Sequence, residues 1–316
     1  MIQVEALTKR YGPTTAVDEL TFAARPGTVT GFLGPNGAGK STTMRMIVGL
    51  ERPTSGTATV GGRRYADLPA PLHAVGVMLD VRSVHPGRTA FRHLLAQART
   101  HGISRSRVDE VIAITGLESV AGRRAGTYSL GMGQRLGIAG ALLGDPETLI
   151  LDEPVNGLDP DGVLWVRGLV RSLAAEGRTV FLSSHLMHEL SLCADRVVII
   201  GKGRLLADAS VSELVQRSEH ASTVRIRTTD PDLLTKVLVG LGAEVVPHDN
   251  GVLNVQGASV DDVGAAAARC GATVLELAAD GGSLEDAYLH LTADAVQYRG
   301  GSTDGTTTDA PAGGAR

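Results

Sequence analysis

The chain contains little cysteine, little aromatic surface and few lysines. Only Cys193 and Cys270 are present among 316 residues, which excludes a disulfide scaffold and fits a reducing compartment. We expect both thiols to behave as small buried apolar side chains. Aromatic residues make up 3% of the chain, so the core must be mostly aliphatic. Lysine occurs at four positions, which makes a lysine within a motif informative: Lys9, Lys40, Lys202 and Lys236.

Long hydrophobic runs are also missing. No stretch of about 18 apolar residues occurs, so we expect no segment that spans a bilayer. Residues 1–12 include a glutamate and no apolar run, and they do not fit a secretory signal. With 43% hydrophobic and 20% charged residues, the composition excludes a chain that is disordered as a whole. These features predict a cytosolic globular protein, for which another chain would have to supply any membrane span.

The net charge of −4 conceals an uneven distribution along the chain. Residues 1–220 contain 24 Lys and Arg against 21 Asp and Glu, whereas residues 221–316 contain 6 against 13. We therefore expect a domain boundary near residue 220, between a slightly basic part and an acidic part. Neither part has the strongly basic footprint that is typical of nucleic-acid-binding proteins.

Up to residue 220, segments rich in β-forming residues alternate with helical patterns. Strands are predicted at 2–8, 21–33, 57–60, 75–79, 148–151, 179–183 and 196–200. Helical patterns cover 40–50, about 88–143, 161–175 and 185–193. This alternation predicts an α/β fold in which helices cover a largely parallel sheet.

After residue 220 the expected elements follow the order βαββαβ. Strands are predicted at 223–227, 243–246, 252–255 and 273–277, and helices at 231–241, 259–269 and 283–292. This order is that of a small ferredoxin-like α+β sandwich. Residues 299–316 lack large apolar side chains and are expected to form a disordered tail. The predicted division is therefore 1–220, with a helical subdomain at about 88–145, then 221–298 and 299–316.

A glycine-rich segment follows the strand predicted at 21–33. It matches G-x-x-x-x-G-K-[ST] and runs Gly34, Pro35, Asn36, Gly37, Ala38, Gly39, Lys40, Ser41 and Thr42. The composition predicts roughly one accidental match per hundred such chains, and the strand-to-helix context is the one that this motif requires. Its glycines would let backbone N–H groups point at phosphate oxygens beside a helix N-terminus. With Lys40 on the β- and γ-phosphates and Ser41 on Mg²⁺, the segment predicts a nucleotide site.

Two carboxylates follow the apolar strand predicted at 148–151. Asp152 suits a water molecule bound to Mg²⁺, and Glu153 suits a general base for an attacking water. Adjacent acids after an apolar run are also common in ordinary loops, so this pair gains its weight from lying downstream of the phosphate-binding segment. Together the two segments predict a P-loop enzyme that activates water.

Three further segments make the assignment specific. They read YSLGMGQR at 128–135, NGLD at 156–159 and SSHLMHE at 183–189. With Tyr11 and the two motifs above, they resemble the ATP-binding cassette (ABC) family over residues 1 to about 220. The resemblance implies the ABC nucleotide-binding fold, which has a RecA-like core with a mixed sheet and a helical subdomain.

The signature of that family reads LSGGQ, and this chain keeps Ser129 and Gly131 of it. It departs at Tyr128, Leu130 and Met132. A serine hydroxyl and a glycine N–H at a helix N-terminus are able to hold a γ-phosphate, although a capped helix without a ligand is the alternative. In the family, the signature of one subunit closes on the P-loop of another. The resemblance therefore implies that two chains build two complete sites, with Asp159 at their interface.

Three more residues take roles from the resemblance. His185 would contact the γ-phosphate and help to orient the attacking water, although His188 lies nearby. Tyr11 would stack on adenine, with an ordinary surface tyrosine as the alternative. Asp80 stands where the family usually has a glutamine that touches Mg²⁺ and the attacking water and relays nucleotide state to the membrane partner. An aspartate can still ligate Mg²⁺, but its charge and shorter side chain predict an altered rate or altered coupling.

The segments LDVRSVHPGRTAFRHL (79–94) and SLGMGQR resemble the daunorubicin-resistance type of drug-export ATPase. This implies a homodimeric ATPase that uses ATP and Mg²⁺ on the cytoplasmic face of the membrane and docks a separate permease through residues 88–145. A soluble ABC ATPase that remodels nucleic acid or ribosomes is the alternative. Such proteins tend to fuse two cassettes or insert coiled coils, and an acidic C-terminal part repels nucleic acid. For the region after 220, permease tethering or dimerisation, effector binding and a structural buttress all stay open.

Overall fold

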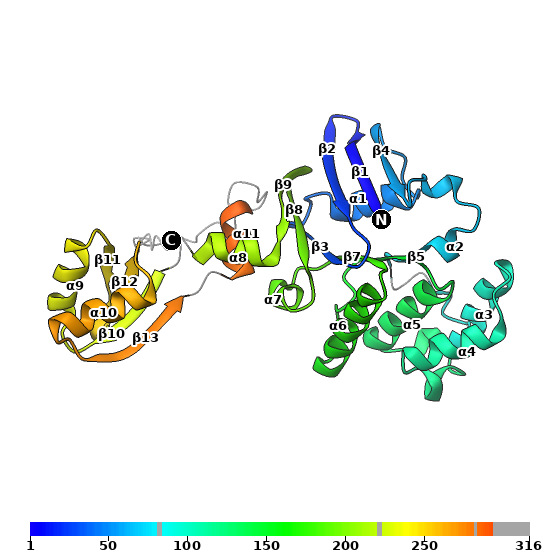
Figure 1. The fold of residues 1–316 in the computed structure, drawn as a ribbon. Coiled ribbons are helices and arrows are strands. Elements are labelled where there is room, and N and C mark those ends of the chain that lie inside the picture. The colour runs from blue at the N-terminus through cyan, green and yellow to red at the C-terminus, as the bar shows by residue number, and fades with distance from the viewer. Residues whose placement is uncertain (81–83, 220–222, 281–282, 293–316) are drawn as a thin grey trace, which may run out of the picture.

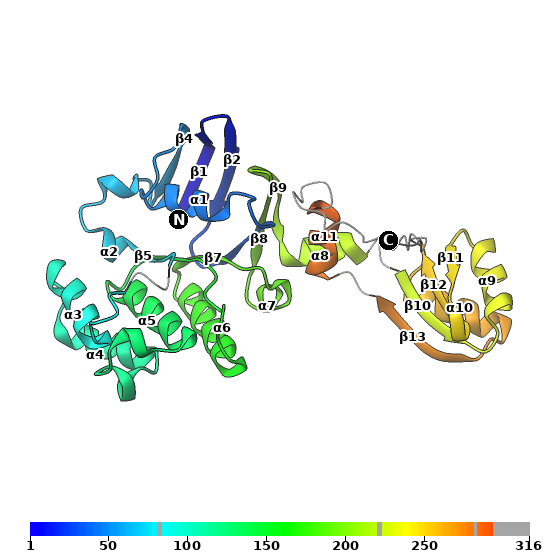
Figure 2. The same ribbon diagram turned by 180° about the vertical axis from the view of Figure 1, so that it is seen from behind.

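The computed structural model describes residues 1–80, 84–219, 223–280 and 283–292. Its strands form three sheets of six, three and four strands. The first two sheets lie in the N-terminal unit, defined here as residues 1–219. The third lies in the C-terminal unit, defined as residues 223–280, which stands apart from the other two sheets in Figures 1 and 2.

The six-stranded sheet is the centre of the N-terminal unit. Its order is β5 (Val75–Met78), β6 (Thr148–Leu151), β7 (Thr179–Ser183), β3 (Val29–Leu33), β8 (Arg196–Gly201) and β9 (Arg204–Ser210). All neighbouring pairs are parallel except β8 with β9, which is antiparallel. The predicted alternating α/β fold is confirmed. The edge strand β9 was missed, because its sequence, RLLADAS, has no regular apolar pattern.

Successive residues of the central strands face two separate hydrophobic clusters, as the pleat of a sheet requires. Leu149 and Leu151 join the cluster on the side of α5 (Leu130–Leu142) and α6 (Pro160–Ala175), whereas Ile150 joins the cluster on the side of α1 (Lys40–Ile47). Three of the few aromatic residues, Phe22, Phe32 and Phe181, are in contact in the second cluster, where the Phe32 and Phe181 ring centroids lie 5.1 Å apart. The core is otherwise aliphatic, as the composition predicts.

The second sheet is antiparallel and packs against α1 (Lys40–Ile47). Its order is β2 (Thr14–Ala24), β1 (Ile2–Tyr11) and β4 (Ser55–Val60). The prediction of a single strand at 21–33 is wrong, because that segment belongs partly to β2 and partly to β3, in different sheets. The break falls at Pro26 and Gly27, where proline lacks a backbone donor and the glycine has a φ of 70°.

Three helices occupy the region expected to be helical between 88 and 145. They are α3 (Ala90–Thr100), α4 (Arg105–Ile114) and α5 (Leu130–Leu142). Each begins at a hydroxyl residue whose side chain accepts a hydrogen bond from the backbone N–H three residues later: Thr89, Ser104 and Ser129. Helices α6 (Pro160–Ala175) and α7 (Met187–Ser191) follow β6 and β7, and the short α2 (Pro71–Ala74) precedes β5.

The C-terminal unit is a four-stranded antiparallel sheet with two helices. The sheet order is β11 (Glu244–Pro247), β12 (Val252–Gln256), β10 (Thr223–Thr228) and β13 (Val274–Asp280). Helices α9 (Pro231–Gly240) and α10 (Val260–Cys270) connect the strands and close a separate hydrophobic cluster that contains Ile226, Leu253 and Ala266. The chain order βαββαβ with this strand order is the ferredoxin-like arrangement, so that prediction is confirmed.

The last described helix, α11 (Leu284–Thr292), was predicted as part of the small C-terminal domain, and this is wrong. It packs on α8 (Val211–Glu219), α7 and β9 of the N-terminal unit, beside α8 in Figures 1 and 2. Leu284, Ala287 and Tyr288 are buried in the same cluster as Leu214 of α8. Burial of this apolar stripe on an existing core is what returns the chain to the N-terminal unit.

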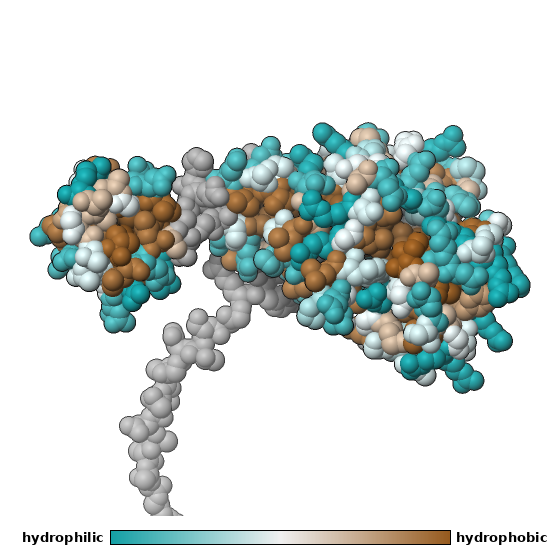
Figure 3. Space-filling model, turned by 60° about the horizontal axis from the view of Figure 1, so that its bottom comes forward, coloured by the Kyte–Doolittle hydropathy of each residue, from teal (hydrophilic) through white to brown (hydrophobic). Residues whose placement is uncertain are grey.

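Within the described ranges, no helix combines the length and the apolar composition that crossing a bilayer requires. Figure 3 shows hydrophilic and apolar side chains interspersed over one face of both units. The tail predicted at 299–316 lies outside the described residues.

Candidate active site

The glycine-rich loop connects the end of β3 to the start of α1. Gly39 has a φ of 102°, and a Cβ there would lie 2.5 Å from the carbonyl oxygen of Ala16. A Cβ on Gly34 would lie 2.6 Å from the carbonyl oxygen of Ile200. Only glycine fits both positions, because the loop backbone runs directly against its neighbours. No side chain caps α1, so a bound phosphate would not compete with a capping side chain for the first N–H groups of this helix.

Lys40 folds back over this loop. Its Nζ donates to the carbonyl oxygens of Gly34 at 2.5 Å and of Pro35 at 3.2 Å. Burial lowers the pKa of Lys40, and the negative charges of Glu153 and Asp152 partly offset this effect. An ammonium group is therefore held at the centre of the loop by neutral carbonyl partners, which an anionic ligand can replace because it carries the opposite charge. The remaining loop residues Asn36 and Gly37 are exposed at the tip, and Ala38 is buried beneath it.

The side chains of Ser41 and Asp152 are hydrogen-bonded at one edge of the six-stranded sheet. The Ser41 hydroxyl donates to Asp152 Oδ2 at 3.1 Å, while Ser183 Oγ donates to Asp152 Oδ1 at 2.5 Å. Asp152 follows β6, and Ser41 lies in the first turn of α1 after β3, so the parallel strands bring both to the same edge. A hydroxyl and a carboxylate are the oxygen donors that Mg²⁺ prefers, and this pair fits such an ion.

Glu153 and His185 form a hydrogen-bonded pair. His185 Nδ1 lies 2.7 Å from Glu153 Oε2, and the two side chains are 56% and 26% exposed. Glu153 has a φ of 50°, in the left-handed region that costs a residue with a side chain roughly 1–2 kcal/mol. Its N–H donates to Ser183 Oγ at 2.9 Å, which fixes the turn on one side. A carboxylate is thus presented beside an imidazole at the end of β6 and β7.

Gln134 fixes the same turn on its other side, and sequence reasoning missed it. Its Nε2 donates to the carbonyl oxygens of Glu153 at 3.0 Å and Asn156 at 3.1 Å. Gln134 is 3% exposed within the largely apolar helix α5. A lone buried amide in an apolar helical pattern was the available signal, because buried polar groups require partners.

The signature residues and Asp159 occupy two helix N-termini. Ser129 caps α5 by accepting the N–H of Met132 at 3.2 Å, and Asp159 caps α6 by accepting the N–H of Gly162 at 2.9 Å. A Cβ on Gly131 would lie 3.3 Å from the carbonyl oxygen of Gly157, so the two helix starts lie close together. Among the described residues, no hydrogen bond joins Ser129 or Asp159 to the loop of 34–39. In the described part of the chain, these two helix N-termini are therefore not bonded directly to the phosphate loop of the same chain.

Tyr11 and Asp80 lie at the ends of β1 and β5. Tyr11 is 48% exposed, and Lys9 Nζ lies 4.9 Å from the centroid of its ring. Lys9 Nζ also lies 2.5 Å from Glu51 Oε1, and this ion pair keeps the ammonium group over one face of the Tyr11 ring. Asp80 is exposed just beyond β5, the parallel neighbour of β6, and Asp152 directly follows β6.

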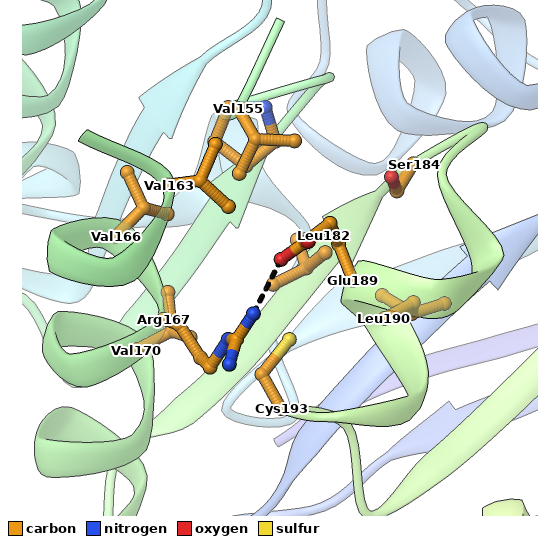
Figure 4. A pocket seen from close by; sticks show the side chains of 11 residues that line it. Val155, Val163, Val166, Arg167, Val170, Leu182, Ser184, Glu189, Leu190 and Cys193 are labelled. Atoms are coloured by element: carbon orange, nitrogen blue, oxygen red, sulfur yellow. Dashed lines mark hydrogen bonds and ion pairs between the residues drawn. The ribbon is translucent and has the colours of Figure 1, made fainter. Parts of the chain in front are cut away.

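Behind the site, α6 and α7 enclose a small cavity lined mainly by apolar side chains (Figure 4). Arg167 Nη2 of α6 lies 2.6 Å from Glu189 Oε2 of α7 across it. Burial raises the pKa of the Cys193 thiol on this wall to about 11, so the thiol stays protonated. The Arg167–Glu189 ion pair links α6, which begins after Asp159, to α7, which begins after His185.

Comparison with known proteins decides the family. A sequence model described as ABC transporter matches residues 17–156. The bacitracin transport ATP-binding protein BcrA of Bacillus licheniformis is 43% identical over 221 residues, which cover 69% of this chain and 72% of that protein. This chain belongs to the ABC transporter family as an ATP-binding subunit. Another relative, the Nod factor export ATP-binding protein I of Paraburkholderia xenovorans, is 37% identical over 76% of this ABC chain and 81% of its own length.

Solved structures agree with the ABC fold. The structure of an ATP-binding subunit of an ABC transporter aligns with a TM-score of 0.63 and 27% identity, covering 69% of this chain and 92% of that one. A dimeric bacterial ABC transporter cassette aligns with a TM-score of 0.62 and 22% identity, over 66% and 98% of the two chains, and shows the fold. Residues 222–285 match a domain of unknown function. The predicted family, fold and drug-export likeness are confirmed.

Proposed function

We propose that this ABC protein hydrolyses ATP and couples hydrolysis to export through a separate membrane permease. The observation that carries the proposal is the convergence of Lys40, the Ser41–Asp152 pair and the Glu153–His185 pair at one edge of the central sheet. An ammonium, two Mg²⁺-type oxygen donors and a carboxylate–imidazole pair are the groups that phosphoryl transfer to water needs.

Substrate binding falls to the loop and the residues around it. The backbone N–H groups of the loop between Asn36 and Gly39 hold the triphosphate, and Lys40 exchanges its carbonyl partners for phosphate oxygens. Ser41 and Asp152 would hold Mg²⁺, which would neutralise phosphate charge, and Thr42 completes the first turn of α1. The exposed face of Tyr11 stacks on adenine.

Hydrolysis falls to the carboxylate and imidazole pair. Glu153 accepts a proton from the attacking water, and His185 orients that water and contacts the γ-phosphate. Asp80, beyond the end of the neighbouring strand, supplies a further carboxylate near Mg²⁺ in place of the glutamine that the family usually has. The protein thus positions the water before charge develops on the phosphate.

A single chain does not complete the site. Ser129, Gly131 and Asp159 lie at helix N-termini that make no hydrogen bond to their own phosphate loop among the described residues. Two copies facing each other would let Ser129 and Gly131 of one chain reach the γ-phosphate held by the other, with Asp159 at the contact. The active form is accordingly a homodimer of two sites.

Transport is supported by the relatives, which are bacitracin transport and Nod factor export ATP-binding proteins. By this proposal, the chain powers the export of a drug-like or antibiotic-like molecule through a permease that docks on α3, α4 and α5. The protein would then lie peripherally on the cytoplasmic face of the membrane. Residues 223–280 form an accessory domain that is inserted between α8 and α11, since both of these helices pack on the N-terminal unit.

Substitution Glu153→Gln tests the catalytic assignment. It removes the proton acceptor and keeps the shape, so ATP should still bind while hydrolysis slows by roughly 10²–10⁴-fold. Single-turnover hydrolysis and light scattering with ATP·Mg²⁺ measure the rate and the dimer that should accumulate. Glu118→Gln, at an exposed position away from the site, is the matched control. A wild-type rate in Glu153→Gln, or a strictly monomeric protein in saturating ATP, contradicts the proposal.

A further inference from the structure

Gln134 is a buried amide whose orientation is fixed by its partners. Its Nε2 lies 3.0 Å from the Glu153 carbonyl oxygen and 3.1 Å from that of Asn156. Both partners are acceptors only, so the NH₂ group must face the turn. Its Oε1 is buried and has no hydrogen-bond partner within the part of the chain that the structure describes. The two N–H bonds to the turn are therefore what holds this side chain.

The turn that Gln134 holds contains the carboxylate assigned as the base. The N–H of Asn156 donates to the Glu153 carbonyl at 3.1 Å, so that carbonyl accepts two hydrogen bonds. Glu153 has a φ of 50°, a conformation that residues with side chains rarely adopt unless their surroundings enforce it. Ser183 holds the N–H side of Glu153, and Gln134 holds its carbonyl side. Among the described residues, the two hydrogen bonds from Gln134 are the only side-chain hydrogen bonds between this turn and α5, and both are lost without Gln134.

Helix α5 carries both Gln134 and the signature residue Ser129 at its N-cap. Ser129 caps α5, and Gln134 lies within the next two turns of the same helix. A helix transmits displacement along its axis with little internal change, so the position of Ser129 sets the position of the Gln134 amide. The Ser129 turn and the Glu153 turn are therefore mechanically linked within one chain.

We propose that Gln134 is a positioning residue. When the signature of its chain contacts the nucleotide bound by the neighbouring chain, Gln134 transmits the resulting movement of α5 to Glu153 of the same chain. This rests on the two-chain site proposed above. Each Glu153 becomes correctly placed only when its own chain's signature has engaged the other nucleotide, which makes the two sites depend on each other. In this role Gln134 acts through the backbone of Glu153, to whose carbonyl oxygen its Nε2 donates.

Three variants separate this role from a folding defect. Gln134→Met keeps the volume and removes both donors, so kcat should fall by about 10²-fold, the scale of a misplaced catalytic group, with little change in ATP affinity. Gln134→Glu offers one O–H donor only when it is protonated, so its rate relative to wild type should rise as the pH is lowered. Gln97→Met is the matched control, since Gln97 is another glutamine with a buried unpaired Oε1, packed against Gly140 of α5.

Mixed dimers show which Glu153 depends on which Gln134. One chain, called the helper, carries Glu153→Gln, so only its partner, the working chain, hydrolyses ATP. Gln134→Met is then placed either in the working chain or in the helper, and single-turnover hydrolysis is compared. We expect the loss only with the substitution in the working chain, because its own turn carries the active Glu153.

An equal loss in both placements, or a loss only with the helper, overturns the proposal, since Gln134 would then merely shape the signature helix. A pH-independent Gln134→Glu defect or an equal defect in Gln97→Met also overturns it. Failure of the two-chain site is seen separately, because a mixed dimer without Gln134→Met would then show no ATP-dependent assembly.

Discussion

The N-terminal and C-terminal units are both sheets covered by helices, but only the first gathers reactive side chains. In its six-stranded sheet, the parallel strands β3, β6 and β7 have their carboxyl ends at one edge, and the loops that follow bring Lys40, Asp152 and His185 together. In the antiparallel C-terminal sheet, strand ends alternate between edges. Its exposed face carries charges that pair locally, such as Arg227 with Glu276 at 3.6 Å. Strand direction therefore decides where chemistry can collect.

The two units also differ in how they use backbone strain and polar burial. The N-terminal unit holds Glu153 in a left-handed conformation and buries Gln134 with an unpaired oxygen. The C-terminal unit closes its core with small and aliphatic side chains such as Ala266, Ala267 and Leu253. Among its described residues the C-terminal unit also has a non-glycine residue with a positive φ, Asn250 at 60°, but asparagine adopts this conformation more readily than glutamate and lies here in an exposed turn. A glutamate held in this conformation beside the groups of the candidate site is the more informative case.

Replacing one histidine in each unit should give the largest difference. His185→Ala removes the partner of Glu153 and should slow ATP hydrolysis by roughly 10²–10⁴-fold, the range for a positioned acid–base group. His248→Ala removes a partner of Asn254 in the C-terminal unit and should leave the rate unchanged. Steady-state phosphate release from the two full-length variants makes the comparison. A comparable loss in both would mean that the C-terminal unit contributes to catalysis.

Core truncations should sharpen the comparison at an intermediate scale. Ile226 and Ile150 are fully buried in different hydrophobic clusters. Ile226→Ala and Ile150→Ala should each lower the free energy of unfolding of the unit concerned by about 2–5 kcal/mol. Calorimetry should show two transitions, and Ile226→Ala should move one of them while ATP hydrolysis persists. A single transition shifted equally by both variants would show that the units unfold together.

Two helix-capping serines should give the smallest difference in stability and a clear difference in function. Ser259→Ala breaks the reciprocal cap with Asp262 on α10, and Ser129→Ala breaks the cap on α5. Each should cost about 1 kcal/mol of stability, measured by denaturant unfolding. Only Ser129→Ala should also impair hydrolysis, because that hydroxyl is assigned to a neighbouring nucleotide. Equal hydrolysis rates in the two variants would reduce Ser129 to a capping residue.

Sequence reasoning predicted much of the fold because its elements follow local patterns. The buried strand at 148–151 and the βαββαβ order after residue 220 appear as predicted. The strand predicted at 21–33 splits between two sheets, and α11 packs on α8. Both outcomes depend on which distant surface accepts an apolar segment, and periodicity alone carries no information about that partner.

The candidate site divides in the same way. The segment from Gly34 to Thr42 was readable from the sequence, because a phosphate cradle is made by consecutive backbone groups whose geometry its glycines dictate. The short distances from Ser41 to Asp152 and from Glu153 to His185, and the hold of Gln134 on the Glu153 turn, depend on strand order and on helix α5. Side chains separated by many residues meet only after the sheet is assembled. The sequence thus determined the chemistry available, and tertiary packing decided which groups act together.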